Sequence, residues 1–519
     1  MARPGFVLEV DDRTPPLLVN DGPRVRLERF PLGTEVVYPP EPLPAVDDLV
    51  VAIDAALAEP VDAEPLAAQL RAGMKLTIAF DDTAATAPLR APDVRGRIIE
   101  RVLVQAAAAG VDDVELICAG GLNRRNTPAE LRQMLGERVF RSFYADGHLT
   151  NHDAADSDRL TVLSAGDGET AEVAINRRVA ESDLLVMVHL VRSLGQGGLA
   201  PAGPAAISGG LGSVASIRAE HGHDPSLAAA AATRSAAAIA DSTPVLQVEA
   251  VLDNANYPRS LNFLGAREWE WTLKTQAKLL GLRQATRLAP ARYAGALNAR
   301  LDSGFRVVEV IAGAPAKVVE RSRARVIEQQ QVDVTGQADV LVLGVPAVTP
   351  HSVDSVTNPV LAAWHALGVG LNSVTSKSLL RDGGSVIVYH PLTPDFSSLH
   401  HPSTIDFFAD VLPATTDAAE LADRFEATYA DDPWYAELYR TSYAFHGVHP
   451  FQLWYRLSAA VQNLGDVIFV GADRASAATL GFRAASTLAD ALEITSATVG
   501  RTPKIRYLHT PPSLLGAVT

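Results

Sequence analysis

Short apolar runs and amphipathic helical patterns alternate along most of the sequence, and this alternation limits the fold more than any other feature. Residues 77–80 and 114–119 have the composition of buried strands, and between them a helix is predicted from Pro92, with an apolar residue every four positions. After the second run, Thr127 and Glu130 have the spacing of a capping box that begins another helix. Such alternation is typical of parallel sheets covered by helices, so the sequence predicts an α/β fold.

The chain is long enough for two domains of this kind. Its 519 residues exceed what a single hydrophobic core usually organises. The alternation restarts after a less regular stretch at residues 245–300, so we place a boundary near residue 295, with one domain at 1–295 and the other at 296–519. Each is expected to hold a mainly parallel sheet flanked by helices, with a ligand cleft between them. Further strands are predicted at residues 184–191, 307–311, 340–345, 386–389, 467–470 and 505–508.

Charge and cysteine content exclude several classes of partner. The formal net charge is −15, from 60 acidic and 45 basic residues, and a surface of this sign repels phosphate backbones. We therefore expect no nucleic-acid partner. Cys118 is the one cysteine, so no disulfide forms within the chain, which fits a reducing compartment. The first residues lack the apolar stretch of a signal peptide, and no run approaches the roughly 18 apolar residues of a membrane span. We expect a cytoplasmic protein with no membrane partner.

Open parallel sheets bind ligands beyond the carboxyl ends of their strands. Asp81, Asp82 and Thr83 follow the first predicted strand. Carboxylates there can orient a ribose, a substrate hydroxyl or a metal-bound water, or they can simply cap a turn. The other loops to search follow Ala119, Val191, Val345 and Tyr389.

A glycine-rich loop precedes a helix predicted at residues 214–220. Backbone N–H groups of Gly209, Gly210 and Gly212 are candidates to bind an anion beside that helix N-terminus, because glycines let such groups converge. The alternative is an ordinary tight turn. The Gly-x-Gly-x-x-Gly fingerprint of dinucleotide-binding proteins is missing, which disfavours an NAD-dependent dehydrogenase.

Several histidines are candidates for chemistry. His221 and His223 are two positions apart and would point to different faces of a helix, so at most one is expected to ligate a metal. His152 can form an oriented imidazole–carboxylate pair with Asp153 or a structural hydrogen bond. His449-Pro450 lies in the densest aromatic stretch of the chain, which lines a ligand cleft or, as we favour, forms a satellite core.

Taken in order, these residues resemble the lactate racemase (LarA) family, whose members carry a nickel-pincer nucleotide. The resemblance rests on residues 80–83, 121–131, 151–153, 175–183 and 216–221, and more loosely on 358–361, 382–384 and 447–449. It implies a cleft between two α/β domains where a hydride moves between a small 2-hydroxy acid and the pincer ring. Two histidines act as acid and base, a lysine holds the nucleotide, and another histidine ligates nickel.

The resemblance places His221 at the nickel ligand but fails at the other positions. Asn123 occupies the place of the first acid/base histidine, and an amide cannot shuttle a proton. Gly195 stands at the second histidine, Ala205 at the lysine and Ala85 at an arginine. No lysine occurs between Met187 and His221. His189 lies at a strand end and is a candidate to replace a lost histidine.

Two hypotheses of different classes follow. The first is a divergent racemase or epimerase of a small 2-hydroxy acid, which binds its nucleotide without a lysine adduct. It would use His189, His152 or a histidine of the second domain for proton transfer. The second is a non-catalytic or regulatory protein that binds a nucleotide or hydroxy acid in the same cleft. The sequence does not predict an oligomeric state.

Overall fold

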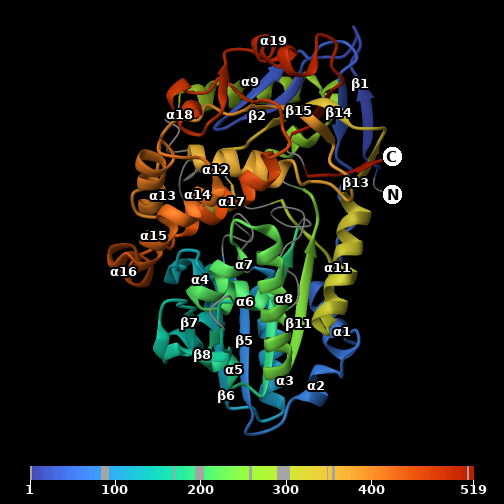
Figure 1. Cartoon of the computed structure of the whole chain (residues 1–519). Coiled ribbons are helices and arrows are strands. Elements are labelled where there is room, and N and C mark those ends of the chain that lie inside the picture. The colour runs from blue at the N-terminus through green and yellow to red at the C-terminus, as the bar shows by residue number, and fades with distance from the viewer. Residues whose placement is uncertain are drawn as a thin grey trace.

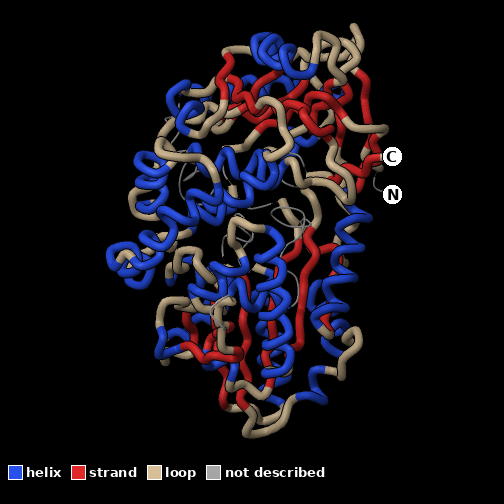
Figure 2. The backbone as a smooth tube through the Cα atoms, viewed as in Figure 1, coloured by secondary structure: helices blue, strands red, loops and turns tan. Residues whose placement is uncertain are grey.

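The structure is a computed structural model that describes residues 3–82, 93–166, 170–192, 204–255, 257, 260–288, 304–347, 349–352, 357–510 and 513–519. Its strands gather in two groups, one at each end of an elongated molecule, with helices around and between them (Figures 1 and 2). Both sheets are mainly parallel and flanked by helices, which confirms the predicted α/β class.

The first sheet has six strands in the order β12-β11-β10-β5-β6-β7. All neighbours are parallel except β11 and β12. The strands are β5 (Lys75–Asp81), β6 (Asp113–Ala119), β7 (Leu149–Asn151), β10 (Leu184–Val191), β11 (Val245–Leu252) and β12 (Val307–Gly313).

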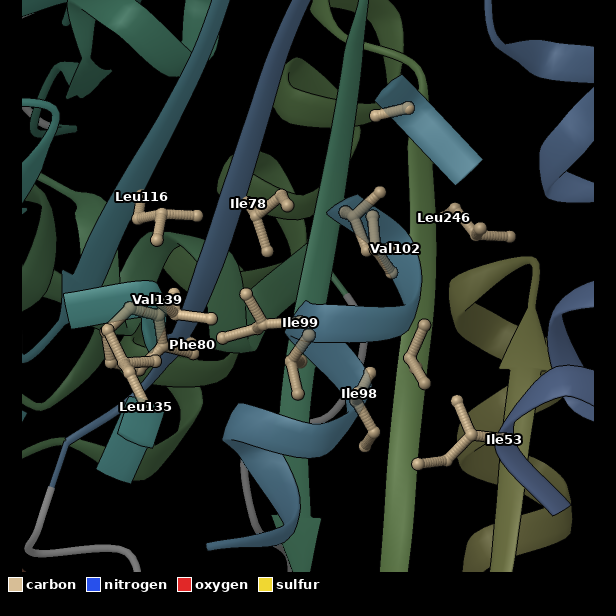
Figure 3. Close-up of a cluster of buried hydrophobic side chains, with 14 of the residues drawn as sticks. Ile53, Ile78, Phe80, Ile98, Ile99, Val102, Leu116, Leu135, Val139 and Leu246 are labelled. Atoms are coloured by element: carbon tan, nitrogen blue, oxygen red, sulfur yellow. The ribbon is translucent and has the colours of Figure 1, made fainter. Parts of the chain in front are cut away.

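Helices cover both faces of this sheet because alternate strand residues point to opposite sides. Ile78 and Phe80 pack against one helical layer, where Figure 3 shows them near Ile99 of α3. Ala79 packs on the other side. The first layer contains α1 (Leu49–Ala58), α2 (Leu66–Gln69), α3 (Val94–Ala108) and α4 (Pro128–Tyr144). The second contains α5 (Arg177–Ala180), α6 (Pro204–Leu211), α8 (Pro225–Ser242) and α11 (Pro315–Gln330), and α7 (Val214–Glu220) packs beside α8.

Local signals in the sequence set several of these boundaries. Thr127 and Glu130 form the predicted reciprocal capping box at the start of α4. Asp93 caps α3, which begins at Val94, whereas Pro92 lies outside the described residues. Strand β10 and helix α7 have the predicted bounds.

The second sheet has seven strands in the order β1-β4-β18-β14-β15-β16-β17, parallel except for β1 on β4. Its strands are β1 (Phe6–Glu9), β4 (Glu35–Tyr38), β14 (Ala338–Gly344), β15 (Leu380–Tyr389), β16 (Val467–Val470), β17 (Arg483–Ala485) and β18 (Ile505–Leu508). Three two-stranded sheets pair β2 (Leu17–Asp21) with β3 (Arg24–Glu28), β8 (Leu160–Ser164) with β9 (Val173–Asn176), and β13 (Gln331–Val334) with β19 (Leu515–Val518).

Helices of the second region pack on its sheet and extend toward the first. They include α12 (Pro359–Ala363), α13 (Pro402–Asp406), α14 (Ala418–Leu421), α15 (Ala427–Asp431), α16 (Pro433–Thr441), α17 (His449–Val461), α18 (Arg474–Thr479) and α19 (Leu488–Val499). Figure 1 shows α12, α14 and α17 on the side of the second sheet that faces the first region. Helix α9 (Leu273–Leu288) packs beside β3.

The two sheets exchange elements across the predicted boundary near residue 295. Strands β1 and β4 from the start of the chain join the second sheet, and β12 and α11 from beyond residue 295 join the first region. The division into 1–295 and 296–519 stays a prediction. The described helices include none that is both long and apolar enough to cross a bilayer.

A buried carboxylate ties three distant segments together in the second region. Glu268 is 5% exposed and accepts hydrogen bonds from the backbone N–H of Leu18 (2.7 Å), the Tyr38 hydroxyl (2.9 Å) and the His509 Nε2 (2.7 Å). Burial alone would raise the pKa of Glu268, but His509 and the hydrogen-bond donors outweigh it and hold that pKa below 4.5.

Glu268→Gln is expected to lower the free energy of unfolding by about 3 kcal/mol at neutral pH, because it leaves buried donors without their charged acceptor. The folded pKa lies below the unfolded one, so this stabilisation is present above the unfolded pKa and is lost as pH falls through the folded pKa. Urea unfolding at pH 7 and at pH 3 measures both effects. Glu270→Gln, which removes an ion pair with the exposed Arg3, is the matched control and should change stability by less than about 1 kcal/mol.

Candidate active site

The topology of the first sheet singles out the carboxyl ends of two central strands. From β5 the chain continues to β6 and β7 on one side, whereas β10 and β11 lie on the other. The carboxyl ends of β5 and β10 therefore form a topological switch point, where open α/β sheets bind their ligands. Asp81 is the last residue of β5, and His189 lies near the end of β10. The strands are parallel, with Phe80 opposite Val188, so the two side chains come together.

Asp81 orients the His189 imidazole. One oxygen of the Asp81 carboxylate makes a short hydrogen bond with His189 Nδ1, and the other accepts from the backbone N–H of Leu190 at 2.8 Å. Burial lowers the pKa of His189, but the Asp81 carboxylate raises it by more, so the net pKa lies above 6.5. His189 Nε2 is buried and finds no hydrogen-bond partner among the described residues. The arrangement is that of an oriented base.

Asp82 lies beside this pair with a different partner. Asn123 donates a hydrogen bond from Nδ2 to Asp82 Oδ2 at 3.0 Å. Burial is the main reason that the pKa of Asp82 is raised to about 6. A carboxyl group with this pKa exchanges a proton near neutral pH.

Arg95 fixes the backbone that carries both carboxylates. Its guanidinium donates to the carbonyl oxygens of Asp81 (2.9 Å) and Asp82 (2.8 Å) and pairs with Asp93 at 2.6 Å. Thr83, the third predicted residue of this loop, lies outside the described residues.

Gly209 and Gly210, predicted to lie in a loop, belong to the last turn of α6 and pack against the loop after β6. Gly121 N–H donates to the Gly210 carbonyl at 2.9 Å, and a Cβ on Gly121 would lie 2.1 Å from the Gly209 oxygen. The close approach of α6 to the loop after β6 therefore requires glycine at position 121.

Of the backbone N–H groups proposed for anion binding, that of Gly212 is engaged within the chain, as are those of the two residues that follow it. Gly212 N–H donates to the Ser208 carbonyl, Ser213 N–H to Ala174 and Val214 N–H to Ala154. These contacts favour the tight turn over the anion site predicted at Gly209, Gly210 and Gly212.

His152 is a structural residue in this arrangement, and the expected pair with Asp153 does not form. His152 Nε2 bonds to the Gly212 carbonyl (2.9 Å), and Asn176 Nδ2 lies 3.2 Å from His152 Nδ1. Asp153 instead pairs with Arg440 at 3.0 Å. Burial lowers the pKa of His152. With both ring nitrogens engaged, this side chain holds the turn between α6 and α7.

His221 caps the C-terminus of α7. Its Nδ1 lies 3.1 Å from the Ile217 carbonyl, and burial, with the charge of Arg456, lowers its pKa to about 3. A neutral ring that donates Nδ1–H to a carbonyl leaves the Nε2 lone pair for a metal. Ile217 packs on Leu122, the neighbour of Asn123, so α7 adjoins the loop that contacts Asp82. His223 instead packs edge-on to Tyr455.

The aromatic stretch near His449 is a core, as favoured from the sequence, and it holds a histidine cluster that the sequence did not reveal. His351 lies 4.9 Å from His449, and Phe445 stacks on both His449 (4.1 Å) and His401 (4.9 Å), measured between ring centroids. None of the six ring nitrogens has a hydrogen-bond partner in the described part of the chain. Over that same part, no group of three or more His, Cys, Asp or Glu side chains is arranged to hold a metal ion.

Sequence reasoning also missed Glu249, which lies opposite His189 on β11. Its pKa is raised chiefly by burial, with His189 acting in the opposite direction. A glutamate in a strand whose other residues, apart from Gln247, are apolar was the available signal.

Asp81→Asn is expected to move the titration of His189 to lower pH, because it removes the charge that raises the His189 pKa. NMR titration of the histidine ring protons measures the shift. Asp82→Asn is the control, since Asp82 contacts Asn123, and should leave the His189 midpoint in place. An unchanged His189 midpoint in Asp81→Asn would contradict the assigned pair.

The fold and site define an α/β protein with two sheet-bearing regions and a histidine–carboxylate pair at a strand-end switch point. Residues 28–233 match the family described as "Lactate racemase N-terminal domain". Residues 28–233 therefore form a lactate racemase-like (LarA-like) N-terminal domain.

Solved structures share the architecture along nearly the whole chain. The lactate racemase apoprotein of Thermoanaerobacterium thermosaccharolyticum superposes with a TM-score of 0.61 at 14% identity, covering 96% of this chain and 99% of that one. A protein of Thermotoga maritima superposes with a TM-score of 0.50 at 10% identity, covering 91% and 97%. No curated protein sequence matches significantly. At these identities the structures establish the fold alone.

Proposed function

We propose that this protein is a lactate racemase-like isomerase of a small 2-hydroxy acid, with His189 as the proton-transferring base. The observation that carries the proposal is the Asp81–His189 pair at the switch point between β5 and β10. An imidazole held at Nδ1 by a carboxylate presents its other nitrogen to a substrate hydroxyl.

The described residues support a sequence of proton movements. His189 Nε2 accepts the hydroxyl proton, and the Asp81 carboxylate stabilises the imidazolium that results. Asp82, with its pKa of about 6, is a second group able to give or take a proton on the neighbouring strand end. Asn123 holds Asp82 through its amide and does not itself exchange a proton.

The family's nickel-pincer nucleotide fits these residues in part. His221 suits a nickel ligand, because its pKa of about 3 keeps the ring neutral and its Nδ1 faces a carbonyl. A lysine adduct does not fit, since no lysine occurs between Met187 and His221. The nucleotide would be held without that bond. When bound, it supplies the acceptor and donor for the hydride of the hydroxy acid carbon.

A second candidate is a binding or regulatory protein for the same hydroxy acid or a nucleotide. Asn123 favours it, because an amide stands where the resemblance requires a histidine and is already engaged by Asp82. In either case we propose a small-molecule partner and a cytoplasmic location. The net charge of −15 and the buried free thiol of Cys118 support this.

The test is to purify the protein from a host that makes the pincer cofactor. The measurements are nickel content, visible absorption and exchange of the α-hydrogen in a panel of 2-hydroxy acids. Exchange is expected, and His189→Gln should slow it by about 10²- to 10⁴-fold because the base is lost. His223→Gln, on a ring that packs against Tyr455, should retain exchange. Nickel-free wild-type protein that shows no exchange would instead favour the binding role.

A further inference from the structure

Arg192 is a cation at the same strand end. It follows the last residue of β10 and lies three positions after His189. The side chain is half-buried, and its guanidinium has neither an ion-pair nor a hydrogen-bond partner anywhere in the described ranges of the chain. Most buried or half-buried arginines in proteins are paired with an anion.

The surroundings of Arg192 hold it in place without neutralising it. The guanidinium carbon lies 5.1 Å from the centre of the Phe305 ring, just before β12, which supports the cation through its π face. Gln330 of α11 donates to the Arg192 carbonyl at 2.5 Å and fixes the backbone. The charge of Arg192 also acts on His365 of the second region. Burial, and then Arg192, lower the pKa of His365 to about 4. Arg192 therefore lies where the carboxyl ends of the first sheet's strands meet the second region.

A neighbouring arginine shows the contrast. Arg306, which follows Phe305 and directly precedes β12, pairs with Asp253 at 3.0 Å. Arg192 has no such carboxylate among the residues that the structure describes, although burial disfavours its charge and lowers its pKa. Guanidinium stays protonated in proteins, so an unpaired one is complementary to an oxyanion, and its planar fork matches the two oxygens of a carboxylate.

We propose that Arg192 binds the carboxylate of the ligand, while His189 on the same strand addresses the hydroxyl. This rests on the proposed function for the identity of the ligand as a 2-hydroxy acid. It assigns the anion-binding role to the carboxyl end of β10 and not to the glycine-rich segment, where the Gly212 amide already donates to the Ser208 carbonyl.

The experiment measures binding by calorimetry, with glycolate, its uncharged ester methyl glycolate, and inorganic phosphate as probes. Wild-type protein should bind glycolate at least about tenfold more tightly than the ester, because a hydrogen-bonded charge pair is worth that factor or more. Arg192→Gln should abolish this preference. Arg192→Lys, which keeps the charge but not the planar fork, should retain part of it. Arg306→Gln is the matched control and should bind as wild type does.

The outcomes separate this inference from the proposed reaction. His189→Gln should keep the preference for glycolate over the ester while it loses exchange. Glycolate binding without α-hydrogen exchange in the wild type would support the role of Arg192 and contradict the proposed isomerase activity. A preference that persists in folded Arg192→Gln, or the absence of glycolate binding by the wild type, would overturn the inference. So would loss of phosphate binding alone in Arg192→Gln, because the guanidinium would then serve a phosphate.

Discussion

The contact of the Asp81 carboxylate with the end of β10 organises the site. One oxygen holds the His189 ring and the other holds the Leu190 backbone, so a single side chain sets both the position and the tautomer of the imidazole. This is feasible only where β5 and β10 are adjacent, parallel and in register at their carboxyl ends. The helical layers on both faces of the sheet maintain that register, because a slip of one residue would exchange the apolar sets that face them.

Residues of the second region contact the loop after β6, next to the candidate site. The Tyr439 hydroxyl donates to the Gly121 carbonyl at 2.7 Å, and the His446 N–H donates to the Leu122 carbonyl at 3.1 Å. The loop that carries Asn123, and through it Asp82, is thus held by residues more than 300 positions away. In the proposed function the acid–base groups are His189 and Asp82, whereas Asn123 positions Asp82 through a hydrogen bond.

Many elements of both regions could be predicted because their signals are local. Apolar runs located β10 and β18, and a capping box located α4. The antiparallel direction of β12 and the pairing of β4 with β18 could not be predicted, since periodicity carries no information on strand direction or partner. The sequence left anion binding and a tight turn open for the glycine-rich segment, because it did not show that Gly209 and Gly210 lie in α6 and that the Gly212 N–H donates to Ser208.

The sequence by itself determined the α/β class and the strand-end position of Asp81, Asp82 and His189, because both follow from hydrophobic period and chain order. Tertiary structure decided which of them meet. It paired His189 with Asp81, engaged both nitrogens of His152 and left Arg192 without an acidic partner among the described residues. Those outcomes depend on burial and on contacts between residues far apart in the chain, which also set the pKa of each group.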